Sequence, residues 1–218
     1  MNLSFIIANW KLNKTLTETK EWIENFLVEG SILLDKKVII CPSFTLLSDL
    51  KSLIEQKNLK IEIGAQNLSS FEIGEYTGEV NAAQIKDFAN YVLIGHSERR
   101  KNFDETNQIL DQKVELAKKY NLEPIYCIQG KDTYIPKGIK IVVFEPLFAI
   151  GTGNPDTPED VEEVGKIIKQ KGLSTFLYGG SVNSENVNSF TSMPSIDGVL
   201  VGMASLDPLE FGKIIKLA

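Results

Sequence analysis

A short run of residues, Ile94-Gly95-His96-Ser97-Glu98-Arg99-Arg100, holds side-chain types that the rest of the chain avoids. His96 is the only histidine among 218 residues, and Arg99 and Arg100 are the only arginines. Histidine suits proton transfer because its unperturbed pKa lies close to neutrality, and arginine offers a planar fork of donors that lysine lacks. The run follows an apolar segment typical of a buried strand. It therefore predicts either proton chemistry at a strand end, or a hydrogen-bonded core histidine beside two surface arginines.

Three more polar side chains follow apolar runs directly. Asn9 and Lys11 come after the run 5–8, and Glu145 comes after the run 139–144. A carboxylate opposite a histidine can divide a proton transfer between a base and an electrophile. Taken singly, Lys11 is more typical of a solvated surface lysine and Glu145 of a charge at a strand end.

Glycine-rich turns form a second set of candidates. Gly179-Gly180-Ser181 and Gly202 each end an apolar run, and Gly151 and Gly153 lie in a loop after Glu145. Backbone N–H groups of such turns can hold a phosphate, although the same glycines could simply form tight corners.

Eight short apolar runs, most of them followed by a helical pattern, predict the elements that position these residues. The runs cover 5–8, 38–41, 61–65, 91–94, 124–128, 139–144, 175–178 and 199–201. The predicted helices cover 15–29, 44–56, 82–89, 104–120, a segment opening at 157, 185–190 and 207–216, with Ser43 and Thr157 as N-caps. This alternation predicts a closed (β/α)8 barrel in a single domain, 1–218. An open doubly wound sheet is the alternative, but no glycine-rich dinucleotide fingerprint follows the first run.

Two connections depart from this regular pattern. Only residues 129–138 separate the fifth and sixth runs, which leaves little room for a helix. Residues Gln66 to Glu79 form a long polar loop, and loops of this length are usually functional or interfacial. In a barrel the active site lies at the carboxyl ends of the strands, so the candidate residues converge on one rim.

The composition of the chain limits the partners and the cellular location that we expect for it. The net charge of −6 argues against nucleic-acid and anionic-membrane partners. The amino-terminal residues lack the features of a signal peptide, and no apolar run could span a bilayer. Cys41 and Cys127 predict a reduced cytoplasmic protein, and one histidine with two separated cysteines lacks a metal-binding spacing.

Several motifs together resemble those of the triosephosphate isomerase family, in the same order along the chain. They are Asn9-Trp10-Lys11-Leu12-Asn13, Gly64-Ala65-Gln66-Asn67, Tyr76-Thr77-Gly78-Glu79-Val80, Ile94 to Arg100, Glu145-Pro146 with Ala149 to Gly153, Tyr178 to Ser181, and Leu200-Val201-Gly202 with Ala204-Ser205-Leu206. The resemblance implies interconversion of dihydroxyacetone phosphate and D-glyceraldehyde 3-phosphate, in glycolysis and gluconeogenesis. No metal or organic cofactor is implied.

The resemblance also implies roles for individual residues. Glu145 would be the general base, neutral His96 the electrophile, and Asn9 and Lys11 would stabilise developing negative charge. The substrate-binding residues would be Asn9, Lys11, Gly151, Ser181, Gly202 and Met203, the last four through backbone N–H groups.

Further implied features lie around the site. Pro146 to Asp156 would be a lid that excludes water and protects the enediolate. Glu98 would neighbour Lys11, and Arg99 would pair with Glu79. The loop Gln66 to Glu79 would make a homodimer, with Thr77 reaching into the partner's active site.

Three departures from the family pattern leave other functions open. The fifth outer helix is reduced or absent, Phe148 stands where the lid usually has Trp, and Met203 stands where a second glycine is usual. If Met203 needs a positive φ, it strains the phosphate cradle. A barrel that has lost catalysis and serves as a binding protein is one alternative, and a different phosphosugar isomerase is another.

A short helix capped by Ser97 would place the His96 ring near its positive end. We therefore expect the pKa of His96 to fall below its ordinary value of about 6.5.

Overall fold

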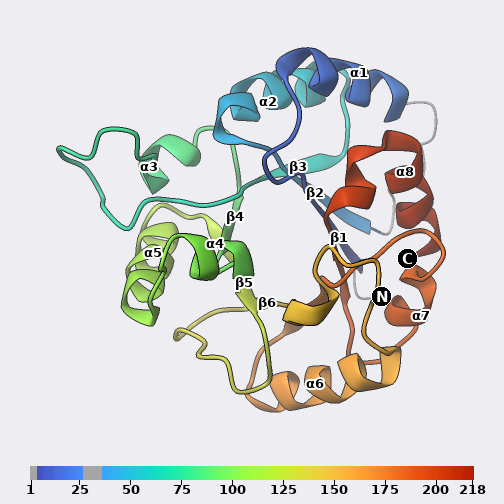
Figure 1. Cartoon of the computed structure of the whole chain (residues 1–218). Helices are drawn as coiled ribbons and strands as arrows, with labels where there is room; N and C mark the ends of the chain where they lie inside the picture. The colour runs from blue at the N-terminus through green and yellow to red at the C-terminus, as the bar shows by residue number, and fades with distance from the viewer. Residues whose placement is uncertain (1–3, 27–35) are drawn as a thin grey trace.

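Eight parallel strands close into a barrel in the computed structural model, which describes residues 4–26 and 36–218. Each strand pairs with its neighbours in chain order, and β1 pairs with β8 to close the sheet. Figure 1 shows the strands in the centre and the helices around them. The strands are β1 (Ser4–Asn9), β2 (Lys36–Cys41), β3 (Ile61–Ala65), β4 (Tyr91–Ile94), β5 (Glu123–Ile128), β6 (Ile141–Phe144), β7 (Thr175–Tyr178) and β8 (Gly198–Val201). The predicted (β/α)8 barrel is confirmed.

The helices follow most of the strands, as the sequence pattern predicts. The α-helices are α1 (Leu16–Phe26), α2 (Leu47–Gln56), α3 (Ala82–Ile85), α4 (Ser97–Asn102), α5 (Asn107–Lys119), α6 (Pro158–Gln170), α7 (Val187–Thr191) and α8 (Pro208–Leu217). Three 3₁₀ turns are η1 (Phe44–Leu46), η2 (Leu147–Ala149) and η3 (Met203–Leu206). The first helix was predicted over 15–29, and its positions 27–29 lie outside the described residues.

One of the three N-caps predicted from the sequence is confirmed: Thr157 caps α6, whereas Ser43 and Ser97 do not act as caps. Thr157 Oγ1 accepts from the N–H of Asp160 at 3.2 Å, so this predicted N-cap of α6 is confirmed. The Ser43 prediction is wrong, because the turn η1 precedes α2 and the Ser43 hydroxyl makes no capping bond. That hydroxyl donates instead to the carbonyl of Lys11, at 3.4 Å.

Apolar side chains pack in two layers, one inside the barrel and one between the sheet and the helices. The inner layer alternates with the outer one along each strand, as the period of a strand requires. Within β5, Ile125 and Cys127 face the barrel interior, while Tyr126 and Ile128 belong to the outer layer. Burial raises the pKa of both thiols, Cys41 and Cys127, which suits small core residues rather than nucleophiles.

The connection between β5 and β6 contains turns but no helix over residues 129–140, all of which the structure describes. The sequence predicts that the helix between these two strands is reduced or absent, and it is absent here. Neighbouring helices hold the loop in place: Lys118 Nζ donates to the carbonyl of Lys137, and Lys171 Nζ to that of Lys131, both at 2.7 Å. The loop is therefore anchored to α5 and to the end of α6.

The long polar loop from Gln66 to Glu79 projects from the barrel together with α3, on the left of Figure 1. Within it the rings of Phe71 and Tyr76 stack at 3.7 Å between centroids. The side chain of Ile73 beside them is 85% exposed. An exposed apolar tip on a projecting loop is typical of an interaction site.

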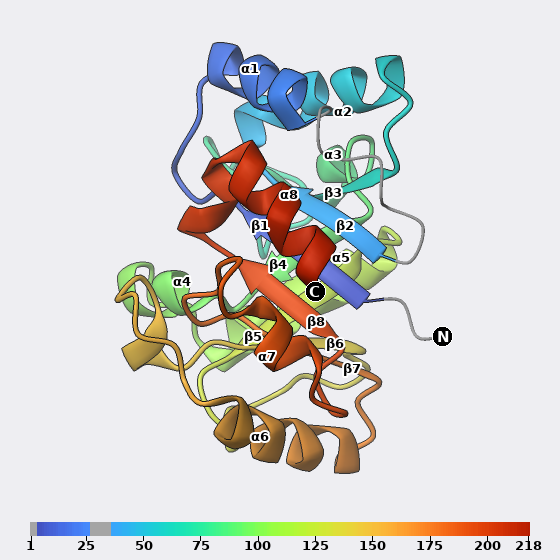
Figure 2. The same cartoon turned by 90° about the vertical axis from the view of Figure 1, so that its right-hand side faces the viewer.

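The carboxyl ends of the strands share one end of the barrel. In Figure 2 the arrowheads of β2 and β8 point toward the left side of the molecule, where α4 lies. None of the helices in the described residues is both long and apolar enough to cross a membrane.

Candidate active site

His96 is held at the end of β4 by the helix that follows it. The helix α4 begins at Ser97, and its N-cap is His96 itself rather than Ser97. The ring Nδ1 accepts a hydrogen bond from the backbone N–H of Glu98 at 3.3 Å. This bond places the proton of a neutral ring on Nε2, because Nδ1 is the acceptor.

Glu145 lies opposite this ring, at the end of β6. Its backbone N–H donates to the carbonyl of Ile128 at 2.8 Å, and its side chain is only 2% exposed. Glu145 Oε1 lies 3.1 Å from His96 Nε2. In the part of the chain that the structure describes, neither Nε2 nor Glu145 Oε2 has a hydrogen-bond partner. Two buried polar groups without partners point to a ligand that supplies oxygen atoms between them.

The pKa of His96 is set by opposing effects in this arrangement. Burial lowers it, while the nearby Glu145 carboxylate raises it, and the net pKa lies above the ordinary histidine value. The sequence-based expectation of a lowered pKa is therefore wrong for this unliganded arrangement. It considered the helix terminus but not the direct approach of a carboxylate.

Lys11 and Asn9 lie together at the end of β1. Lys11 has a left-handed backbone with φ of 52°, which is rare for a residue other than glycine. Asn9 Oδ1 accepts the Lys11 N–H at 3.1 Å, and Gln66 Nε2 donates to the Lys11 carbonyl at 2.9 Å. The sequence alone assigns no role to Gln66, which supports the strained backbone from a distant loop. The Lys11 ammonium lies 2.6 Å from Glu98 Oε1, as the resemblance implies.

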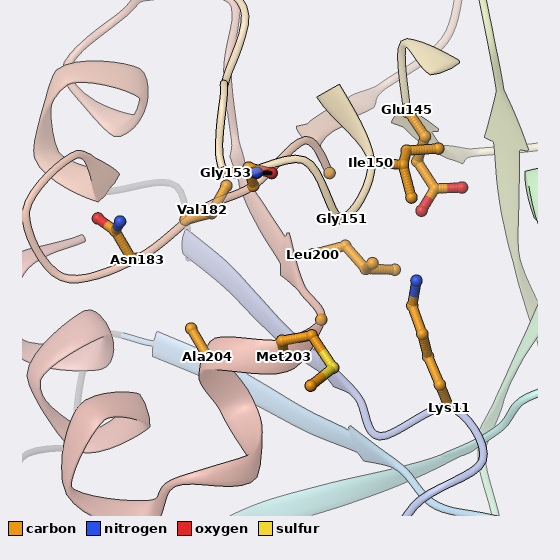
Figure 3. A pocket seen from close by; sticks show the side chains of 13 residues that line it. Lys11, Glu145, Ile150, Gly151, Gly153, Val182, Asn183, Leu200, Met203 and Ala204 are labelled. Atoms are coloured by element: carbon orange, nitrogen blue, oxygen red, sulfur yellow. Dashed lines mark hydrogen bonds between the residues drawn. The ribbon is translucent and has the colours of Figure 1, made fainter. Parts of the chain in front are cut away.

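A cavity of about 230 Å³ is lined by Lys11, by Glu145 and by the glycine-rich turns. Figure 3 shows the Lys11 ammonium and the Glu145 carboxylate pointing toward one another at its edge. Its lining includes all four residues expected to bind phosphate through the backbone: Gly151, Ser181, Gly202 and Met203. Their N–H groups donate to no protein acceptor within residues 4–26 and 36–218. Free N–H groups that line one cavity together with a lysine suit the binding of a small anion.

Met203 does not strain this cradle. It opens η3 and is absent from the residues with positive φ, so its backbone pays no conformational penalty. Its side chain lines the pocket and is largely exposed (Figure 3). The concern that a methionine disturbs this turn through positive φ is not supported.

The segment from Pro146 to Asp156 closes one side of the cavity. Gly153 N–H donates to Ser181 Oγ at 3.2 Å, and Ser181 Oγ donates to the Ala149 carbonyl at 2.5 Å. Asp156 N–H donates to Tyr178 Oη at 2.7 Å. These bonds tie both halves of the segment to the end of β7 and to the turn that follows it.

Two sequence-derived expectations concern residues outside this cavity. Thr77 lies on the projecting loop and is exposed in the single chain. Arg99 pairs with Glu105 within the chain, so the expected pairing with Glu79 is wrong here. No group of three His, Cys, Asp or Glu side chains that could hold a metal occurs among the described residues.

Comparisons with known proteins agree on one family. A sequence model described as triosephosphate isomerase matches residues 4–218. A triosephosphate isomerase of Mesomycoplasma hyopneumoniae is 41% identical over 96% of this chain and 97% of its own length. That of Dictyoglomus thermophilum is 37% identical over 99% and 100%, and that of Aquifex aeolicus is 36% identical over 96% and 97%. The first two alignments span 238 and 251 positions, so these relatives carry residues that the 218-residue chain lacks.

Proposed function

The chain belongs to the triosephosphate isomerase family, and on this basis we propose how its residues interconvert dihydroxyacetone phosphate and D-glyceraldehyde 3-phosphate. The enzyme is an intramolecular aldose–ketose isomerase of glycolysis, and its substrate is a triose phosphate. The roles of single residues described below are our proposal.

The contact between His96 and Glu145 carries this proposal. Glu145 takes a proton from C1 of dihydroxyacetone phosphate, and the C–H electron pair forms the double bond of an enediolate. Glu145 then returns the proton to C2, while a proton moves from the C1 hydroxyl to the oxygen on C2. Glu145 as base and His96 as proton donor lie 3.1 Å apart, and each has a polar atom without a partner. This arrangement suits the transfer of a proton from one carbon to its neighbour.

His96 polarises the substrate carbonyl and carries protons between the two oxygens. Substrate inserted between the ring and Glu145 separates the two groups and removes the attraction that raises the pKa of His96. The Glu98 N–H on Nδ1 then favours the neutral ring, whose Nε2–H faces the substrate. Lys11 and Asn9 stabilise the negative charge that develops on the oxygens.

The far end of the cavity binds the phosphate. The N–H groups of Gly151, Ser181, Gly202 and Met203 supply donors, and Lys11 supplies positive charge. The lid from Pro146 to Asp156 then excludes water, which would otherwise let the enediolate lose its phosphate.

Two wider features complete the proposal. The chain works as a single barrel domain, 1–218, in the cytoplasm, where its two buried free thiols suit a reducing compartment. It assembles as a homodimer through the loop Gln66 to Glu79, whose exposed apolar tip is available to a second copy.

A coupled assay with glyceraldehyde 3-phosphate tests the function, and the same reaction in D₂O tests the mechanism. We expect rapid turnover and product deuterated at the carbon that receives the proton, because a carboxylic acid exchanges with solvent. An inactive wild-type protein would overturn the function. Turnover without any deuterium exchange would overturn the role of an exchangeable base such as Glu145.

A further inference from the structure

Arg100 makes a set of contacts that the proposed reaction does not yet use. Its Nε donates to the Gly95 carbonyl at 2.7 Å. One terminal nitrogen donates to the Cys127 carbonyl at 3.2 Å and to the Tyr126 hydroxyl at 3.0 Å. The guanidinium also lies 5.5 Å from the centroid of the Tyr126 ring. No carboxylate pairs with it among the described residues, so its donors are directed to the two carbonyls and the hydroxyl.

The two carbonyls belong to neighbouring strand ends. Gly95 follows β4 and immediately precedes His96 in the chain. Cys127 lies near the end of β5 and precedes Ile128, whose carbonyl accepts the backbone N–H of Glu145. Arg100 therefore connects the backbone that carries His96 to the backbone that holds Glu145.

The local backbone is shaped for this guanidinium. Gly95 has φ of 74°, and a Cβ placed on it would lie 2.8 Å from the terminal nitrogen of Arg100. A side chain at position 95 would thus both strain the backbone and displace the arginine. A planar fork can reach two carbonyls and a hydroxyl together, whereas an ammonium offers no such fixed geometry.

Tyr126 completes the arrangement on the outer side of the sheet. It is fully buried and belongs to the apolar layer between the sheet and the helices. Its hydroxyl accepts a hydrogen bond from Arg100. The guanidinium is therefore held by a rigid, buried side chain of β5 as well as by the two carbonyls.

We propose that Arg100 is a positioning residue for the isomerisation, which fixes the relative position of the backbones that carry His96 and Glu145 by bridging the carbonyls of Gly95 and Cys127. This inference rests on the proposed roles of those two residues. It does not require Arg100 to touch the substrate, because the effect is transmitted through the strand ends.

The test compares Arg100→Lys, which keeps the charge but loses the fork, with Arg100→Met, which loses both. We expect kcat to fall by about tenfold to 100-fold in both variants, because a displacement of about 1 Å can cost on the order of 10²-fold. KM should change little, because the phosphate contacts lie elsewhere. In Arg100→Lys the NMR titration midpoint of the single histidine should also fall, because a looser contact with Glu145 weakens the attraction.

Arg99→Lys is the matched control, since it makes the same change one position earlier on α4 and retains a cation for Glu105. It should keep kcat within about twofold of the wild-type value, as expected for an arginine outside the transition-state contacts. Should Arg100→Met fail to fold, Arg100→Lys alone decides the question.

Several results would overturn the proposal. Wild-type kcat in folded Arg100→Lys would show that the charge suffices and that no positioning fork is needed. A lower kcat with an unchanged His96 midpoint would indicate general destabilisation instead. An inactive wild-type chain would overturn the proposed function itself, a failure that the wild-type assay detects before any variant is compared.

Discussion

At the scale of single residues, the site concentrates burial, strain and unpaired polar atoms in a few side chains. His96 and Glu145 are 4% and 1% exposed, yet each leaves a polar atom without a partner among the described residues. Lys11 and Ser181 both adopt positive φ, at 52° and 51°. Such features cost stability, so their presence at one cavity is a sign of function.

Changes at Glu145 test the base directly. Glu145→Asp retracts the carboxylate by about one methylene, and we expect kcat to fall on the order of 10²-fold with little change in KM. Glu145→Gln keeps the shape but loses the base, and should lower kcat further. Steady-state assays in both directions measure this. Near-normal turnover in Glu145→Gln would rule out the assignment.

The titration of His96 provides a second test at this scale. In the unliganded enzyme its NMR midpoint should lie above the ordinary value of about 6.5, because burial, which lowers the pKa, is outweighed by the combined effect of Glu145 and Glu98, which raise it. In Glu145→Gln the midpoint should drop. A folded pKa above the unfolded one means that protonation of His96 stabilises the fold below about pH 6.5. That contribution is lost as the pH rises through the folded pKa.

Only one set of imidazole signals exists, so no assignment is needed. A wild-type midpoint below the ordinary value would contradict the dominant role of Glu145 and restore the expectation from the helix terminus. Phosphate-free buffer is required, because an anion in the cavity would itself alter the titration.

At the scale of elements, the lid depends on hydrogen bonds to the turn after β7. Gly180 allows this close approach, because a Cβ there would lie 2.4 Å from Tyr178 Oη and 2.9 Å from the Cβ of Ala149. The lid and the strand-end turn are therefore fitted to each other at atomic distance. A change in either should alter closure before it alters the stability of the barrel.

Tyr178→Phe tests lid closure, because it removes the acceptor of the Asp156 N–H and keeps the ring. One hydrogen bond contributes about 1 kcal/mol, so we expect kcat to fall by roughly fivefold. Release of inorganic phosphate per turnover should rise, since a less closed lid exposes the enediolate to water. The stack of the ring on Phe190, at 4.3 Å, should preserve the fold. Unchanged kcat and phosphate release would show that this bond does not hold the lid.

At the scale of the whole molecule, the projecting loop is the feature that a single chain leaves unexplained. Its apolar tip includes Ile73, and Thr77 lies exposed nearby on the same loop. The rest of the barrel has its apolar residues largely in the two core layers. The homodimer that we propose would account for the length of this loop and for its exposed apolar residues.

Thr77→Arg tests the assembly by adding a bulky charge to the loop. We expect sedimentation velocity to show a shift from dimer to monomer, together with lower activity, because burial of an unpaired charge is costly. Ser52→Arg, the same addition on the exposed face of α2, should leave both unchanged. A wild type that sediments as an active monomer would refute the dimer.

The barrel and most of the residues at its rim follow from local sequence patterns. The spacing of apolar residues and the local composition decide whether a segment forms a strand or a helix. The eight strands and the absence of a helix in 129–138 could therefore be predicted from the sequence. The single histidine, Glu145 and the glycine turns each end a run, and parallel strands bring such ends to one face.

Tertiary structure alone decided how these residues act on one another. The pKa of His96 depends on a carboxylate 49 positions further along the chain, and its direction was therefore not predictable from the helix beside it. The bond of the Ser43 hydroxyl to Lys11, the Gln66 support of Lys11 and the Arg100 bridge likewise depend on contacts between segments that are distant in the chain. Sequence patterns indicate on which face of a strand or helix a side chain lies. Contacts between distant segments are set instead by the register of the strands and by the closure of the barrel.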